Sequence, residues 1–349
     1  DRSLFLGDFV PPGQYVARVL VHGGIGVVHA GSFYNPGTPP WPTAAGTGAW
    51  GSDHTIFSAV AAMPKGSPAK GRVFLGSHGG ECGVGFIGLN AEGRKMWEWV
   101  RLGSGAQQLA AADRHVYFCY RDVTGADALG RVNPDTGEEI AFAGKPNVRL
   151  PAAPGGLAIG GGAVVVSLPS LNKALVLDPE SGEVRREIAV DGPRSLALTP
   201  AGRLAGVGAK GLFYVELGGG NVVPTPQLPV GKPEAVCVDA AGRFYVSDAA
   251  DSNVKVFDRV GRSARLLRTI GEPGGHRPGP WNPRRMAAPS ALAVEDRGDG
   301  SSRLWATENN YRPRRVSVWT SDGAVMRDYI GNTGYMGTDG LLSDDVPDL

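Results

Sequence analysis

Four short apolar segments recur in the same order six times along this chain, and this repetition constrains the fold more than any other feature. The central residues of the first segments lie 39 to 56 positions apart. A turn rich in Asp, Asn and Gly separates the third segment from the fourth, as in DPESGEV (178–184) and NAEGRK (90–95). Such turns join neighbouring antiparallel strands. The central residues are Val60, Leu109, Leu157, Leu196, Val236 and Leu292.

Four strands in each repeat of about 40–50 residues are typical of a β-propeller blade. The 53 glycines and 27 prolines favour many short strands, and no stretch shows a useful helical period. We therefore predict an all-β fold, a six- or seven-bladed propeller of four-stranded antiparallel blades. Fourth strands are expected at, for example, KMWEWV (95–100) and EIAFAG (139–144). The six recognisable blades are predicted at 53–104, 105–150, 151–191, 192–231, 232–271 and 289–331.

The two ends of the chain lie outside these repeats. Residues 1–52 contain a strand-like stretch and a Gly/Pro-rich segment, and we expect them to pack on the propeller or to close it. Residues 332–349 are predicted to be a C-terminal tail. Because an open edge strand favours aggregation, the ring must close. Residues 15–34 could supply strands to the last blade or to a partial seventh one, or a missing part of a longer parent chain could complete the ring.

Two stretches resemble known families. PEAVCVDAAGRFYVSDAADSNVKVFDRVG (233–261) and the stretch 288–323 resemble NHL-type propeller repeats, and VPPGQYVARVLV (10–21) resembles the last strand of a FlgD-type Ig-like module. The resemblance implies a propeller used for binding, within a secreted or surface-attached bacterial protein. It also implies an extracellular or periplasmic location and further domains in a longer parent chain.

Composition excludes several classes of function. The net charge is +1, and no run of Lys and Arg or RNA-binding motif appears, so we expect no nucleic-acid partner. No apolar run approaches the roughly 20 residues of a membrane-spanning helix. Three cysteines without close spacing form neither a disulfide framework nor a zinc motif.

Propeller geometry places the candidate site at the turns between second and third strands, which meet around the central channel on one face. One of these turns is DAADSN (248–253), whose closely spaced oxygen ligands suggest calcium. We interpret it first as a turn, because Lys255 and Asp258 stand where a calcium loop would carry its last ligand. The predicted ligand-binding residues are Asp122, Lys210, Asp248, Glu308, Asn309 and Arg312.

An enzyme is the alternative interpretation. His54, His78 and Glu81 could converge as ligands of a divalent ion, calcium or a transition metal. A histidine beside a tyrosine and an arginine suits proton abstraction next to a carboxylate, so the catalytic candidates are His78, Tyr120 and Arg121. The sequence contains no local motif for metal binding and none for nucleophilic hydrolysis that would support a metal-binding or a catalytic role for these residues.

We therefore favour a binding or scaffold propeller that recognises a polysaccharide or protein on the face of the second-to-third turns. The alternative is a lyase or hydrolase acting on a sugar-like or lactone-like substrate at the mouth of the channel, with help from a metal. These hypotheses differ in whether the candidate side chains converge.

Overall fold

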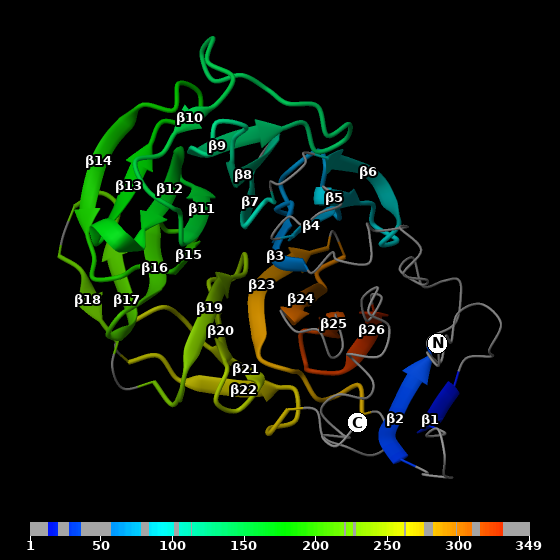
Figure 1. The fold of residues 1–349 in the computed structure, drawn as a ribbon. Coiled ribbons are helices and arrows are strands. Elements are labelled where there is room, and N and C mark those ends of the chain that lie inside the picture. Colours follow the sequence, from blue (N-terminus) through cyan, green and yellow to red (C-terminus); the bar gives the residue numbers. More distant parts are fainter. Residues whose placement is uncertain are drawn as a thin grey trace.

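The computed structural model describes most of the repeat region (Figure 1). Of the expectations above, the segment 36–56, the tail 332–349, and His54, His78, Glu81, Asn309 and Arg312 lie outside the described residues. The described ranges are 13–19, 28–35, 57–77, 84–100, 105–112, 114–219, 221–225, 228–261, 263–275, 282–297, 299–308 and 315–330.

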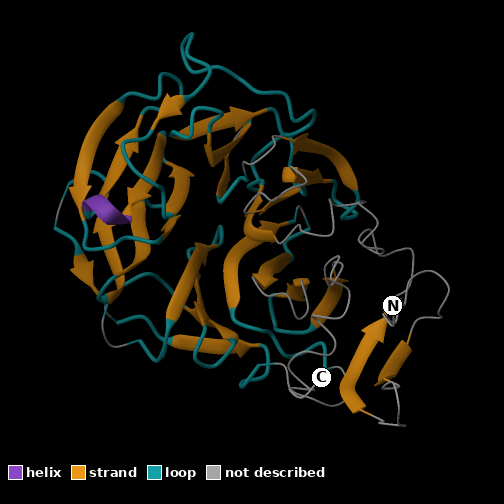
Figure 2. Cartoon of the chain, viewed as in Figure 1, coloured by secondary structure: helices purple, strands orange, loops and turns teal. Residues whose placement is uncertain are grey.

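Six four-stranded antiparallel sheets stand around a ring, so the chain is a six-bladed β-propeller, as predicted (Figures 1 and 2). Each blade uses four consecutive strands. Blade one is β3 (Phe57–Ala62), β4 (Val73–Ser77), β5 (Val84–Leu89) and β6 (Lys95–Val100), and blade two is β7 (Gln108–Ala112), β8 (His115–Arg121), β9 (Asp127–Val132) and β10 (Val148–Arg149). Blade three is β11 (Gly156–Gly160), β12 (Ala163–Leu168), β13 (Lys173–Leu177) and β14 (Val184–Ala189), with the 3-10 turn η2 (Pro169–Leu171). Blade four is β15 (Ser195–Leu198), β16 (Arg203–Gly208), β17 (Gly211–Glu216) and β18 (Val223–Pro224). Blade five is β19 (Pro233–Val238), β20 (Phe244–Asp248), β21 (Asn253–Phe257) and β22 (Leu266–Ile270), and blade six is β23 (Pro289–Asp296), β24 (Ser302–Glu308), β25 (Arg315–Thr320) and β26 (Val325–Ile330).

The predicted turns between third and fourth strands have the backbone that their sequences require. Gly93, Gly137, Gly182 and Gly323 all adopt positive φ, between 70° and 98°. L-residues with a Cβ rarely adopt this conformation, so glycine is favoured at these positions. In the turn of blade three, the Asp178 carboxylate accepts hydrogen bonds from the next backbone amides, which fixes the direction in which the fourth strand returns.

The outer strand predicted for blade two at EIAFAG is wrong. Glu139 and Phe142 make only isolated bridges, and the outer strand is β10, which pairs with Ala128 and Leu129. The reason is packing, because the Phe142 ring is fully buried between blades two and three. The guanidinium of Arg131 lies 4.7 Å from its centroid. Because this ring is buried, residues 139–144 do not form the edge strand, which lies later in the chain at Val148–Arg149.

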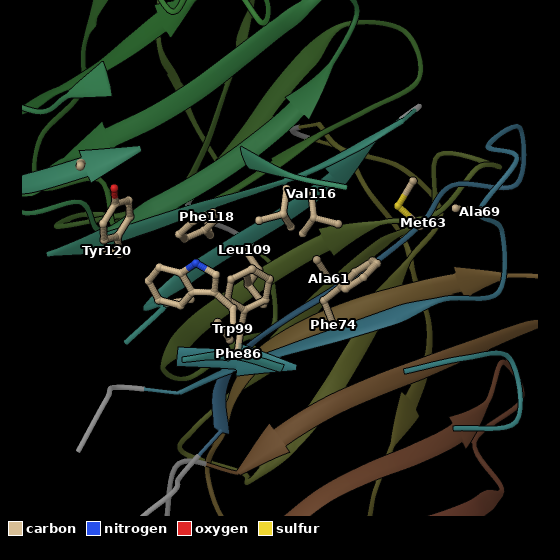
Figure 3. Close-up of a cluster of buried hydrophobic side chains, with 14 residues drawn as sticks. Ala61, Met63, Ala69, Phe74, Phe86, Trp99, Leu109, Val116, Phe118 and Tyr120 are labelled. Atoms are coloured by element: carbon tan, nitrogen blue, oxygen red, sulfur yellow. The ribbon is translucent and has the colours of Figure 1, made fainter. Parts of the chain in front are cut away.

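The hydrophobic core consists of six clusters, one between each pair of neighbouring blades. Figure 3 shows the cluster between blades one and two, where the rings of Phe86, Trp99 and Phe118 meet edge to face or tilted. Near the axis, each interface between neighbouring blades contains the same contact. The central Val or Leu of one blade's innermost strand packs against a small residue of the preceding blade. That small residue directly follows the preceding blade's own central residue. Those small residues are Ala61, Ala110, Ala158, Ala197, Cys237 and Ala293.

This alternation of large and small predicts how the axis responds to substitution. Cys237 occupies a position that the other blades fill with alanine, and burial raises the pKa of its thiol, so it packs as a small apolar residue. We expect Cys237→Ala to change the free energy of unfolding by less than about 1 kcal/mol. Ala158→Leu should cost about 1–3 kcal/mol, because no space remains beside Leu196. Chemical denaturation of both variants tests this, and equal losses would contradict it.

A side-chain hydrogen bond links each blade to the next around the ring. In each blade one side-chain N–H donates to a backbone carbonyl in the third-to-fourth turn of the next blade. In the four blades with a long fourth strand, the donor lies on that strand, opposite the third-strand residue just before the register shift. In blades two and four the outer strand has only two residues, and an arginine of an inner strand is the donor instead. The donor and acceptor pairs are Trp97 to Pro134, Arg131 to Pro179, Arg186 to Leu217, Arg203 to Val260, Arg268 to Ser321 and Arg327 to Glu92.

The last of these pairs belongs to the closing interface, where blade six packs against blade one. Arg327 donates to the Glu92 carbonyl at 2.6 Å, and the stacked rings of Trp305 and Tyr329 share a core cluster with Val60. Both blades contain their own four strands, so the ring closes by packing and side-chain hydrogen bonds. β1 (Gly13–Val19) and β2 (Val28–Asn35) pair with each other in a separate sheet.

Candidate functional site

In the described part of the chain, the turns between second and third strands and the links between blades lie on one face of the ring, called here the upper face. The turns between third and fourth strands lie on the opposite, lower face, because the strands of a blade are antiparallel. The Asp248 carboxylate, in the β20–β21 turn, accepts hydrogen bonds from the amides of Gly231 and Lys232 in the link that leads into blade five. Turn and link are therefore adjacent, as the sequence argument for a site on this face requires.

In the DAADSN turn, Asp248 is fully buried at the end of its strand. Besides the two link amides it binds the Ala250 amide and the Lys255 ammonium, at 3.1 and 2.6 Å. The same ammonium lies 2.7 Å from Asp251. An internal cation thus neutralises the two carboxylates that suggested a calcium loop, and the turn pins the incoming link to the blade.

Burial alone would raise the pKa of Asp248, but the hydrogen bonds from Lys255 and the link amides outweigh it and lower the pKa to about 2. A carboxyl whose pKa falls on folding stabilises the protein above its unfolded pKa, near 3.8, and loses that contribution as the pH falls toward 2.

We therefore expect the stability difference between the wild type and Asp248→Asn to shrink from pH 4 to pH 2. Thermal unfolding across this range measures it. The matched control is Asp191→Asn, because Asp191 makes only a looser, exposed pair with Lys210 at 3.6 Å. A difference between the wild type and Asp248→Asn that stays constant over this range would contradict the role assigned to Asp248.

Glu308 plays the corresponding part in blade six. Its carboxylate accepts a hydrogen bond from the Ala287 amide at 2.7 Å, in the link leading into the blade, and pairs with the Arg315 guanidinium at 2.8 Å. Both partners of this ion pair are fully buried. Arg315 also donates to the carbonyls of Pro283 and Arg285. Asp248 and Glu308 hold the links in place; that they also contact a ligand stays a prediction.

Blade two places its three candidates in different surroundings. Tyr120 is buried, its hydroxyl accepts a hydrogen bond from the Asn147 amide at 2.9 Å, and its ring packs against Trp99. Arg121 is exposed and lies 3.6 Å from Asp127. Tyr120 and Arg121 follow each other in β8 and therefore point to opposite sides of the sheet. The structure does not bring their side chains together.

The remaining described candidates, Asp122 and Lys210, differ in exposure. The Asp122 side chain is only 10% exposed, because hydrogen bonds hold it inside its own turn. The hydrogen bond from the Thr124 hydroxyl is the main reason that the pKa of Asp122 lies below its usual value. The Lys210 side chain is 85% exposed. Of these two side chains, the carboxylate is therefore held in its own turn, whereas the ammonium reaches the solvent.

Sequence reasoning missed the cations that neutralise the buried carboxylates. Lys255 follows Asp248 by seven residues, and Arg315 follows Glu308 by the same number. The sequence does contain a signal for these ion pairs. In two consecutive blades an acidic residue ends the second strand, and a basic residue follows seven positions later in the third strand. Within the described ranges, no group of three or more His, Cys, Asp and Glu side chains is arranged to hold a metal ion.

Comparison with known proteins supports the fold. A chain of the nidogen/laminin complex is 16% identical, with 79% of this chain and 92% of that chain covered and a TM-score of 0.52. A catalytically inactive virginiamycin B lyase from Staphylococcus aureus with quinupristin is 14% identical, with 91% and 88% covered and a TM-score of 0.50. No protein-family model and no curated protein matches the chain. At these identities the likeness shows the propeller fold alone.

Proposed function

We propose that this propeller is a non-catalytic binding module that recognises a polar ligand, a glycan or a protein, on its upper face. The observation that carries the proposal is the separation of roles on that face. The buried carboxylates Asp248 and Glu308 hold the links, while Arg121, Arg149, Lys210 and Lys232 extend into solvent. A face on which solvent-exposed cations lie beside buried, hydrogen-bonded carboxylates suits recognition of acidic or hydroxyl-rich groups.

The described catalytic candidates favour binding over proton transfer. A general base must come within hydrogen-bond reach of its substrate. Tyr120 is buried and hydrogen-bonded to Asn147, and its neighbour in the chain, Arg121, points to the other side of the sheet. Placement of the module in a secreted or surface-attached bacterial protein stays a prediction from the sequence resemblance. Among the described residues, no helix has the length and apolar character needed to span a membrane.

A screen that reports both binding and turnover tests the proposal. Purified protein is applied to immobilised glycans and peptides, each captured molecule is released and analysed by mass spectrometry, and the metal content of the same sample is determined. We expect at least one captured molecule to be recovered chemically intact. Its conversion to an eliminated or hydrolysed product would overturn the proposal and support the lyase or hydrolase alternative, as would a stoichiometric metal required for that conversion.

A further inference from the structure

Two exposed apolar side chains stand on neighbouring turns of the upper face. Val123, in the β8–β9 turn of blade two, is 87% exposed, and Leu171, in the η2 turn of blade three, is 44% exposed. Blades two and three share a core cluster, so the turns belong to adjacent blades. The other exposed large apolar residues in the described ranges lie on outer strands; they are Val184, Leu266, Leu267 and Met326.

The turn that carries Val123 is rigid. The Asp122 carboxylate accepts hydrogen bonds from the Thr124 amide, the Thr124 hydroxyl and the Ala126 amide, at 2.8, 2.6 and 3.0 Å. Gly125 closes the turn with positive φ and a backbone hydrogen bond to Asp122. The valine is therefore held in solvent by a turn that several hydrogen bonds fix. A partner that covers it does not have to order the loop first, which lowers the entropic cost of binding.

The turn that carries Leu171 is fixed in a similar way. Asn172 adopts a left-handed conformation with φ 49°, and its amide donates to the Pro169 carbonyl. Its side-chain oxygen accepts a hydrogen bond from the Gly192 amide at 2.9 Å, and its carbonyl accepts one from Val190. The tip of blade three is thereby attached to the link that leads into blade four, and Leu171 is presented beside it.

Exposed cations lie on the same turns and on the neighbouring strand and link; Arg149 also donates to the Thr124 hydroxyl, next to Val123 in the chain. The Arg149 side chain is 69% exposed and only 3.9 Å from Asp122, and Arg121 has a similarly loose pair with Asp127. Arg194 and Lys210 add exposed positive charge on blade four. The anions of these pairs are mostly low in the surface, so the charge that a partner meets on this sector is largely positive. Arginine beside exposed apolar side chains is typical of the energetically dominant part of protein interfaces.

The lower rim has the opposite character. In the third-to-fourth turns of the described ranges, exposed acidic side chains outnumber the exposed basic ones, which are Arg94, Lys145, Arg259 and Arg265. These turns are therefore less favourable to an acidic partner than the cationic sector of blades two to four. The acidic residues are Glu92, Asp135, Glu138, Glu139, Glu180, Glu183, Glu216 and Asp322.

We propose that the upper face of blades two to four is the docking surface for a polypeptide that places acidic side chains around one or two apolar ones. The inference rests on the binding function proposed above and names its partner. The apolar side chains of the partner would cover Val123 and Leu171, and its carboxylates would reach Arg121, Arg149 and Lys210. A glycan lacks the apolar groups that would cover both tips, so the pair of apolar tips favours a protein.

A phage-displayed library of random short peptides, selected on the intact protein, tests this docking surface. We expect the enriched peptides to combine Asp or Glu with Leu, Ile, Val or aromatic residues. Val123→Ser should weaken their binding on the order of ten-fold, and Arg149→Glu should do the same. The matched control is Val184→Ser, which removes an equally large apolar side chain from the exposed outer strand of blade three and should leave affinity unchanged.

Three results would overturn the inference: no enrichment, enrichment of basic or wholly polar sequences, or binding that Val123→Ser does not alter. The outcome for the binding function is separate. If an intact glycan or nucleic acid binds and Lys210→Glu weakens it while no acidic peptide binds, the upper face is a binding site but the polypeptide is the wrong partner. If nothing binds the upper face, both proposals fail. Circular dichroism spectra of the variants establish that they are folded.

Discussion

Replacing Glu308 with Gln should lower the free energy of unfolding by about 3–5 kcal/mol, because it leaves a buried guanidinium without its counter-charge. Arg315 has no exposed surface and is paired with Glu308 at 2.8 Å. Glu308 also holds the Ala287 amide of the link into blade six. The substitution therefore weakens both the ion pair and the attachment of the link.

Urea denaturation followed by fluorescence measures this loss. Lys173→Met is the matched control, because Lys173 and Glu187 form a partly exposed pair at 2.8 Å, and its removal should cost less than about 1 kcal/mol. The double variant Glu308→Leu with Arg315→Met should be more stable than Glu308→Gln, since it removes both charges. A loss for Glu308→Gln no larger than that of the control would show that the pair does not hold the link.

Replacing Trp305 with Ala should cost about 3–5 kcal/mol and weaken the closing interface. The indole stacks on Tyr329 with ring centroids 5.7 Å apart, and it packs in one cluster with side chains of blade one. Its N–H donates to the buried Glu295 carboxylate at 2.9 Å. The substitution would open a cavity where the ring closes and leave Glu295, whose pKa burial already raises, without this donor.

Trp305→Phe separates the two effects. It keeps most of the apolar contact but removes the donor, so we expect a loss of about 1–3 kcal/mol. Calorimetry of both variants provides the measurement, and hydrogen exchange in β3 and β23 shows whether blades one and six open first. An unchanged transition for Trp305→Ala would contradict closure of the ring by this interface.

Much of the fold was predictable because each blade encodes its strands locally. Short apolar runs in the inner strands and glycines such as Gly182 and Gly323 in the hairpin turns act within a few residues. The outer strand of blade two was not predictable from local pattern. Phe142 lies in a stretch with the apolar pattern of an edge strand, but its ring packs between blades two and three. This packing exists only once neighbouring blades have come together.

The adjacency of the second-to-third turns and the links was also predictable, but the state of their side chains was not; that they form a ligand site stays a prediction. Asp248 and Asp251 lie three residues apart in the same turn, yet one is buried against a link and the other is half exposed. That difference depends on amides at Gly231 and Lys232, which are distant in sequence. Val123 likewise lies exposed in a turn that the Asp122 carboxylate holds through several hydrogen bonds, which composition does not reveal.

Reversal of charge on one face at a time tests the central claim, that ligand recognition resides on the upper face, most directly. Affinity for a glycan or peptide captured in the screen is measured by calorimetry for the wild type, for Lys210→Glu with Lys232→Glu, and for Glu92→Lys with Glu183→Lys on the lower rim. We expect a loss on the order of ten-fold for the first variant and none for the second. Equal affinities in all three proteins, or a loss confined to the lower-rim variant, would contradict it.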